Sequence, residues 1–152
     1  MILLGHFAAA VIAADLTGSD KAAAIAGTLL PDVIDKTGGW VLRVMPAGRW
    51  LAHGLPFFAA AAAVTCPLLP SRTWRGFVAG YASHLATDLY AGGRVPWFAP
   101  FEPPPHRRNG RLNLPAALVE ETAGAAFLWW RARRSAALPR TPSDAVVPAC
   151  SV

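Results

Sequence analysis

One short stretch combines an imidazole and a carboxylate at a spacing that suits metal binding. His84 and Asp88 lie four positions apart in a segment, 80–89, that otherwise consists mainly of small and apolar residues and reads as helix. Side chains at i and i+4 share a helical face, with Cβ atoms about 5–6 Å apart, so both can hold one metal ion. Because burying unpaired polar groups is costly, this pair needs further partners within the fold.

Other polar residues interrupt apolar segments elsewhere in the chain, and their types match this pair. They are His6, Asp32, Asp35 and His53. A lone histidine in an apolar helix is more often a hydrogen-bonded core residue than a ligand, and two aspartates after a proline fit an ordinary capping turn. Separate explanations of this kind are harder to accept for all six residues together. Mixed histidine and aspartate ligands without cysteine suit zinc, manganese or iron, so the sequence predicts a divalent metal, zinc or manganese.

The elements that must position these residues read as helices. Hydrophobic residues make up 54% of the 152 residues and charged residues only 15%, and the strand-forming residues do not alternate. We expect one all-α domain over residues 1–134, a compact multi-helix bundle of about five helices embedded in the membrane, and a disordered tail at 135–152. The predicted helical segments are 2–16, 21–30, 55–69, 72–91 and 114–134. The second should end at Pro31, because proline disfavours helix in the residue before it, and 36–50 should be irregular.

The distribution of positive charge bears on the partners of the chain. The formal net charge is +5, and arginines gather at 107–111 and 131–140. There is no basic stripe along one helix of the kind that DNA-binding proteins show, so no nucleic-acid partner is expected. The tryptophans at 129–130 followed by arginines are typical of a membrane helix that leaves on the cytoplasmic side. The apolar runs are shorter than the roughly twenty residues that cross a bilayer, so a soluble helical bundle stays an alternative.

Taken in order, the motifs resemble a known family. They are Gly5-His6, Leu30-Pro31-Asp32-Val33-Ile34-Asp35, His53-Gly54 and His84-Leu85-Ala86-Thr87-Asp88, followed by a segment rich in proline and aromatic residues. Over about residues 1–102 this order resembles the bacterial membrane-bound metal-dependent hydrolases and, more remotely, zinc-dependent phospholipase C. The resemblance implies a multi-pass protein of the bacterial inner membrane, in contact with membrane lipid, that hydrolyses an ester and in particular a phosphoester.

The resemblance also implies metal ligands within this set. His53, His84 and Asp88 would form a first metal site, and His6 would join Asp88 at a second site if Asp88 bridges the two. Asp32 would be a further ligand or the general base.

Catalysis and substrate binding follow from the same resemblance. Asp32 would carry the proton transfer, supported by Asp35. The metal would lower the pKa of water toward 7 and polarise the phosphoryl oxygen. Arg107 and Arg108 are candidates to bind the anionic ester through paired hydrogen bonds, although a solvated cluster, or one that faces lipid head groups, is the more ordinary explanation.

The central histidine box leaves a second function open. It holds one histidine, His53, where the family usually has two, and Pro56 stands near the position of a serine. In this alternative the chain is a non-catalytic helical membrane protein whose metal site is structural or vestigial. Nothing in the sequence indicates the oligomeric state.

Overall fold

The computed structural model describes residues 3–45, 49–90, 95–103 and 114–137. Within these ranges the secondary structure is helical and no strand occurs, which confirms the all-α prediction. The α-helices are α1 (Leu3–Thr17), α2 (Lys21–Lys36), α3 (Leu55–Thr65), α4 (Ser71–Tyr90) and α5 (Leu114–Ala137). Two short elements lie between α2 and α3, the π-helix η1 (Thr37–Val41) and the 3-10 helix η2 (Leu51–His53).

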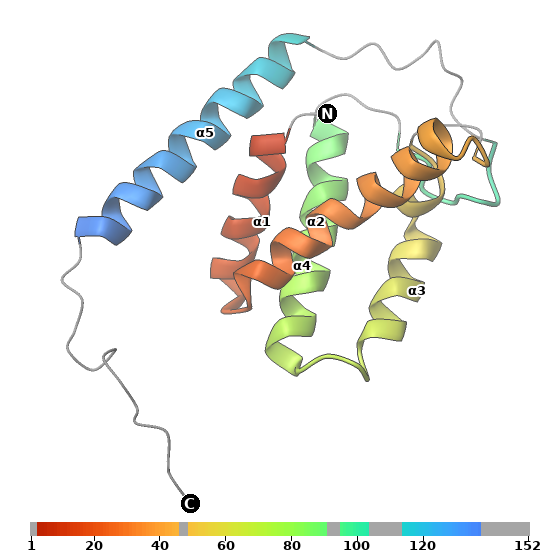
Figure 1. Ribbon diagram of the computed structural model, residues 1–152, viewed down its shortest axis with the longest axis horizontal. Coiled ribbons are helices and arrows are strands. Elements are labelled where there is room, and N and C mark those ends of the chain that lie inside the picture. The colour runs from red at the N-terminus through yellow and green to blue at the C-terminus, as the bar shows by residue number, and fades with distance from the viewer. Residues whose placement is uncertain (1–2, 46–48, 91–94, 104–113, 138–152) are drawn as a thin grey trace, which may run out of the picture.

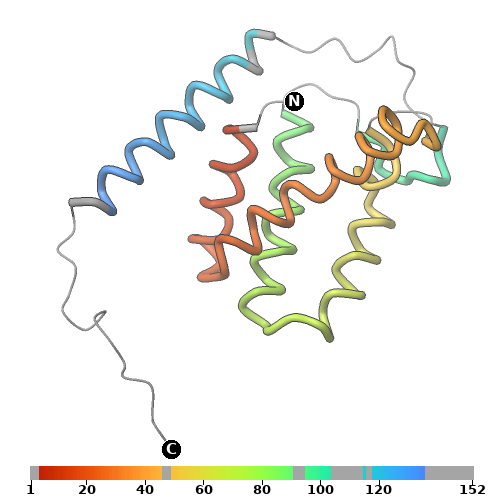
Figure 2. Tube along the Cα trace, viewed as in Figure 1, coloured from red at the N-terminus to blue at the C-terminus, as the bar shows by residue number. Residues whose placement is uncertain are grey.

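Three helices form the centre of the bundle. α2 crosses α4 obliquely, and α1 packs against both of them (Figure 1). α5 lies against α1 on one side, and α3 contacts α4 and η2 on the other. The trace in Figure 2 shows that the N-terminal end of α1 and the C-terminal end of α4 lie at the same end of the bundle. Residues at these two helix ends can therefore meet.

The crossing of α2 and α4 depends on two glycines that let the backbones touch. A Cβ atom on Gly80 would overlap the carbonyl oxygen of Ala24, and one on Gly27 would overlap that of Phe77. Small residues at a helix crossing allow this close approach, and no larger side chain fits without moving a backbone. The contact fixes how closely α2 and α4 approach each other where they cross.

The prediction that the second helix ends at Pro31 is wrong. Asp20 caps α2 by accepting hydrogen bonds from the N–H groups of Ala22 and Ala23, and the helix continues through Pro31 to Lys36. A proline inside a helix removes one backbone hydrogen bond, which burial against neighbouring helices outweighs here. Asp32 and Asp35 therefore lie on one face of a helix and not in a capping turn.

Other predicted boundaries also shift. Residues 36–50, expected to be irregular, include the two short helical elements η1 and η2. α5 extends to Ala137, so the predicted domain end at 134 falls inside a helix, and 138–152 lie outside the described residues, as do Arg107 and Arg108. None of the described helices combines the length and the apolar character needed to cross a membrane, so the predicted transmembrane helices are not found in this part of the chain.

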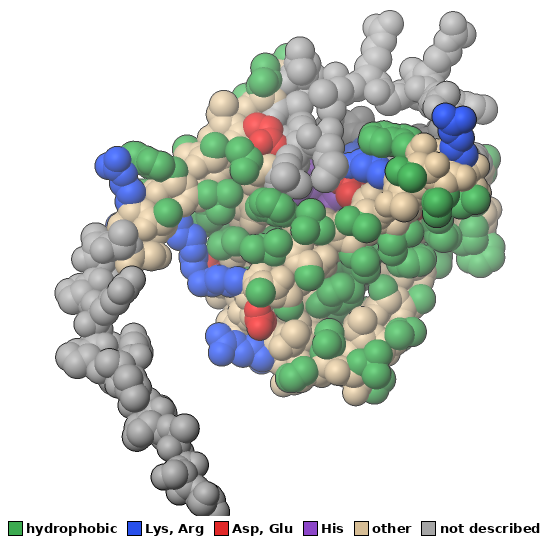
Figure 3. Space-filling model, viewed as in Figure 1, with side chains coloured by type: hydrophobic (Ala, Val, Ile, Leu, Met, Phe, Trp, Pro, Cys, Tyr) green, Lys and Arg blue, Asp and Glu red, His purple; other side chains and the backbone are tan. Residues whose placement is uncertain are grey.

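The interior holds an unusual share of polar side chains. An alanine cluster, Ala10, Ala14 and Ala24, fills one part of the core, and Tyr81, Leu85 and Val95 fill another. The fully buried side chains also include two histidines and two aspartates. In the space-filling view, histidine surface lies between acidic and basic side chains at the top of the molecule, while apolar side chains cover much of the visible face (Figure 3). Because buried polar groups need partners, these histidines and aspartates must interact with one another or with a bound group.

Candidate metal centre

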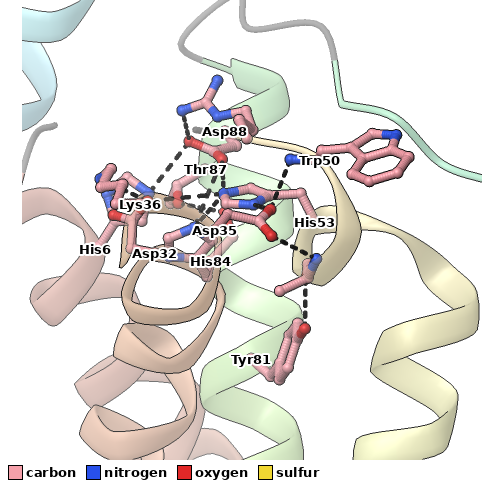
Figure 4. Close-up of polar contacts among 12 residues, drawn as sticks. His6, Asp32, Asp35, Lys36, Trp50, His53, Tyr81, His84, Thr87 and Asp88 are labelled. Carbon is pink, nitrogen blue, oxygen red and sulfur yellow. Dashed lines mark hydrogen bonds and ion pairs between the residues drawn. The ribbon is translucent and has the colours of Figure 1, made fainter. Parts of the chain in front are cut away.

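The polar residues singled out in the sequence come together at one end of the bundle (Figure 4). α1 contributes a histidine, α2 two aspartates, η2 a histidine, and α4 a histidine and an aspartate. In chain order they are His6, Asp32, Asp35, His53, His84 and Asp88, and all six are buried. Residues as far apart in the sequence as His6 and Asp88 therefore lie close together in the fold.

Three electron-rich atoms face one another at the centre of this cluster. The Nε2 atoms of His53 and His84 are 3.2 Å apart, and Oδ2 of Asp88 lies 3.2 Å from the first and 3.5 Å from the second. Ligand atoms around a tetrahedral zinc ion, with bonds of about 2.0–2.1 Å, are separated by about 3.3 Å. Among the described residues, Oδ2 of Asp88 has no hydrogen-bond partner although it is buried. The three atoms thus fit a shared cation.

Asp35 orients His53 for this role. Its Oδ2 accepts from the N–H of Trp50 at 2.6 Å and lies 2.7 Å from Nδ1 of His53, while its Oδ1 accepts from the N–H of Ala52 at 2.9 Å. Burial alone would raise the pKa of Asp35, but the hydrogen bonds from His53 and from the two amides outweigh it and hold the pKa below its usual value. The carboxylate therefore draws the imidazole proton to Nδ1 and leaves Nε2 facing the centre.

A second carboxylate–histidine pair lies at α1. Nε2 of His6 is 3.5 Å from Oδ1 of Asp88, and Nδ1 of His6 is 3.6 Å from Oε1 of Glu120 on α5. The carboxylate oxygens of Glu120 are buried, and loss of solvation raises the pKa of its carboxyl group. The two oxygens of Asp88 thus face different histidines, the geometry of a carboxylate that bridges two sites.

His84 belongs to two groups of ligand atoms that lie within 4.8 Å of one another: His6, His84 and Asp88, and Asp32, His53 and His84. Oδ1 of Asp32 is 3.8 Å from Nε2 of His53. Burial lowers the pKa of His84, which favours the neutral imidazole that a metal requires. The structure therefore brings together every histidine and aspartate predicted as a ligand, while their roles stay predictions.

Two side-chain cations contact the same carboxylates. Lys36 Nζ lies 2.5 Å from Oδ1 of Asp32, one turn earlier in α2, and a guanidinium nitrogen of Arg49 lies 2.6 Å from Oδ1 of Asp88. Burial would raise the pKa of Asp88, but the three neighbouring histidines and the charge of Arg49 hold the pKa far below its ordinary value. Asp88 is therefore a carboxylate in this site.

The sequence reasoning did not single out Lys36, Arg49 or Glu120 as site residues. The sequence could have indicated Lys36, because it lies four residues after Asp32 on the same helix face. No sequence pattern indicates Arg49, since it contacts Asp88 from 39 positions away in the chain. Glu120 stands in an apolar stretch of α5, where a carboxylate is unexpected. Tyr81 was also missed; its hydroxyl donates to the carbonyl of Ala52 and holds η2 against α4.

Comparison with known proteins gives one match, to a protein family model. The family model described as YdjM inner membrane protein matches residues 2–146. No curated protein and no solved structure matches the chain. The predicted link to a bacterial membrane protein family is thus supported, whereas the predicted likeness to metal-dependent hydrolases and to phospholipase C is not supported by any of these comparisons.

Proposed function

The chain belongs to the YdjM inner membrane protein family, and from this premise we propose that it is a metal-dependent hydrolase of the inner membrane that acts on an ester, in particular a phosphoester. The proposal has three parts. The cofactor is a divalent metal (zinc or manganese), the substrate is an anionic ester, and the protein contacts membrane lipid. Each part has its own support among the described residues.

One observation carries the metal. His53, His84 and Asp88 point three electron-rich atoms at one another with separations of 3.2–3.5 Å. Without a cation between them, Oδ2 of Asp88 is a buried carboxylate oxygen that makes no hydrogen bond of good geometry with the described residues, which is costly in a low-dielectric interior. A divalent ion held by these three groups would leave coordination positions open, as in catalytic rather than structural sites.

The residues around the metal ligands suit hydrolysis. A divalent metal, when bound, would act as a Lewis acid on the ester and lower the pKa of water in the site. Asp32, 3.8 Å from the Nε2 atom of His53, serves either as a further ligand or as the base that accepts the proton from water. Asp35 contacts three donors and is fully buried, so we assign it a positioning role. Asp35 holds His53 in place and does not meet the substrate.

Metal analysis and turnover test this function together. Protein purified without chelator should contain zinc or manganese and hydrolyse a chromogenic phosphodiester, and Asp88→Asn should lose both metal and turnover. Asp15→Asn is the matched control, because Asp15 is a carboxylate of α1 that pairs with Lys21 and Arg131 at the surface. A protein that binds the metal but turns over no ester class would leave a binding role alone.

A second candidate is a structural role for the same cluster. Lys36 and Arg49 already compensate one oxygen of Asp32 and one of Asp88, so part of the negative charge is neutralised by the chain itself. In that case the site stabilises the bundle and carries no reaction. Removal of the metal then lowers the melting temperature strongly, whereas a catalytic site loses turnover with the fold retained.

Contact with lipid is supported by an apolar run beside the site. Trp40, Val41, Leu42 and Val44 follow α2 directly, and each exposes between 62% and 74% of its surface. Arg43 stands between the last two of these residues, and exposed aromatic and aliphatic side chains beside a basic residue are typical of membrane-contacting surfaces. We propose that this run, residues 40–44, contacts the inner membrane to which the family description refers.

A further inference from the structure

Two cations stand at the outer edge of the metal centre. Arg49 contacts Oδ1 of Asp88, whereas Oδ2 of the same carboxylate faces the histidines. Lys36 contacts Oδ1 of Asp32. The side chains of Arg49 and Lys36 are 36% and 20% exposed, against 2% and 7% for the two aspartates. The cations therefore form a rim between the buried ligands and solvent, through which a substrate would enter.

A divalent ion would reverse the sign of the charge summed over the three aspartates and the two cations of this cluster. Lys36 contacts Asp32 and Arg49 contacts Asp88, and with Asp35 as a third carboxylate these five side chains sum to a charge of about −1. One divalent ion converts this to about +1. A metal bound to Asp32 and Asp88 would also weaken the attraction between these carboxylates and the cations Lys36 and Arg49. These side chains would then attract an anion that they repel in the absence of the metal.

From this arrangement we propose that Arg49 and Lys36 form an anion clamp, which holds the phosphoryl group of the substrate once the metal is bound. The clamp deepens the proposed function and rests on it, because the charge reversal requires the metal. Arginine presents a planar fork that matches two oxygens of a phosphoryl group, and lysine supplies a point charge. The clamp restricts substrates to anionic esters and excludes neutral carboxylic esters and amides.

Trp40 supports the position of Lys36. The ammonium of Lys36 lies 5.9 Å from the centre of the Trp40 ring while it contacts Asp32. A cation held between an aromatic face and a carboxylate keeps its charge at the rim and does not swing into bulk solvent. Because Trp40 begins the exposed apolar run, the clamp lies next to the surface proposed to contact lipid.

Binding of inorganic phosphate to the full-length protein tests the clamp without any turnover. The protein is first titrated with Mn²⁺, and phosphate is then added while the paramagnetic broadening of its phosphorus NMR signal is followed. We expect wild-type protein to bind phosphate only after Mn²⁺. Arg49→Met and Lys36→Met should each weaken phosphate binding about tenfold or more, as expected for lost hydrogen bonds between charged groups, with Mn²⁺ binding retained.

Two further variants make the outcome decisive. Arg49→Lys keeps the charge but loses the fork, so an intermediate loss of phosphate affinity is expected even if Arg49→Met does not fold. Arg75→Met is the matched control, because Arg75 is exposed on α4 and its Nε donates to the Ser71 carbonyl; phosphate binding should not change.

Different results would overturn different parts. Mn²⁺ binding together with unchanged phosphate affinity in the Arg49 and Lys36 variants overturns the clamp alone. A wild-type protein that binds no Mn²⁺ and no Zn²⁺ in the first titration overturns the proposed function and the clamp with it. Equal phosphate binding with and without metal also contradicts the clamp, because it removes the need for charge reversal.

Discussion

Replacing Asp35 by asparagine should damage the metal centre from outside its ligand set. The two side chains have nearly the same shape, so the change alters hydrogen bonding and charge but little packing. Asp35 accepts from the N–H groups of Trp50 and Ala52 and from Nδ1 of His53. An amide group has one accepting oxygen and one donating NH2. It therefore cannot accept all three hydrogen bonds.

Either orientation of the new amide has a cost. If its oxygen takes the place of Oδ2, its NH2 faces the N–H of Ala52, and a buried donor is left unsatisfied at about 1–3 kcal/mol. If its oxygen takes the place of Oδ1, the NH2 faces His53, whose Nδ1 must then accept. The proton moves to Nε2 and points at the metal, so the imidazole cannot bind it. Loss of such a support typically weakens metal binding about 10- to 100-fold, or roughly 1.4–2.7 kcal/mol.

The measurement is competition for Zn²⁺ or Mn²⁺ against a chelating dye, with urea unfolding of the metal-free protein alongside. Asp35→Asn should lower the metal affinity about 10- to 100-fold. It should also lower the free energy of unfolding by about 1–3 kcal/mol, because one buried donor is left unsatisfied. Asp15→Asn, at a surface carboxylate, should change neither by much, because exposed ion pairs contribute little. If folded Asp35→Asn binds metal as tightly as wild type, Asp35 does not determine which nitrogen of His53 faces the metal, and the reasoning fails.

Three further predictions concern the frame around the site. Gly80→Ala should destabilise the protein by at least about 1–3 kcal/mol in urea unfolding, because its methyl group would overlap the Ala24 carbonyl; wild-type stability would show that the α2–α4 crossing is looser than described. Asp20→Ala should cost about 1 kcal/mol in the same assay, since it removes the N-cap of α2, and no loss would mean that water replaces the cap. Trp40→Ser combined with Leu42→Ser should reduce sedimentation with anionic lipid vesicles while metal content stays constant; undiminished sedimentation would exclude this run as the lipid contact.

Much of the site could be predicted because its signals are local. The i,i+4 spacing of His84 and Asp88 needs only a helix, and polar residues in apolar segments stand out wherever they occur. The predicted helices 2–16 and 72–91 also agree closely with α1 and α4. Spacing within one helix could not show that α1, α2 and η2 would bring their ligands to the same end of α4.

The parts that sequence reasoning missed depend on tertiary contacts. A proline at position 31 predicts a helix end, yet burial of α2 against α4 keeps the helix intact. Two glycines, which weaken isolated helices, here permit that burial. Arg49 follows a segment that the sequence predicts to be irregular, and only the fold shows that its side chain reaches Asp88. Helix propensity and residue spacing contain none of this information.

Lys36 and Arg49 connect the stability of the fold with the proposed function. In the absence of a metal they compensate carboxylates that would otherwise be buried without a countercharge. A metal ion must therefore compete with them for Asp32 and Asp88, so its measured affinity is lower than the ligand geometry alone would give. It follows that Arg49→Met should bind Mn²⁺ at least as tightly as wild type although it binds phosphate less well. Two opposite changes from one substitution are expected of a clamp, whereas a purely structural ion pair would lower both affinities together.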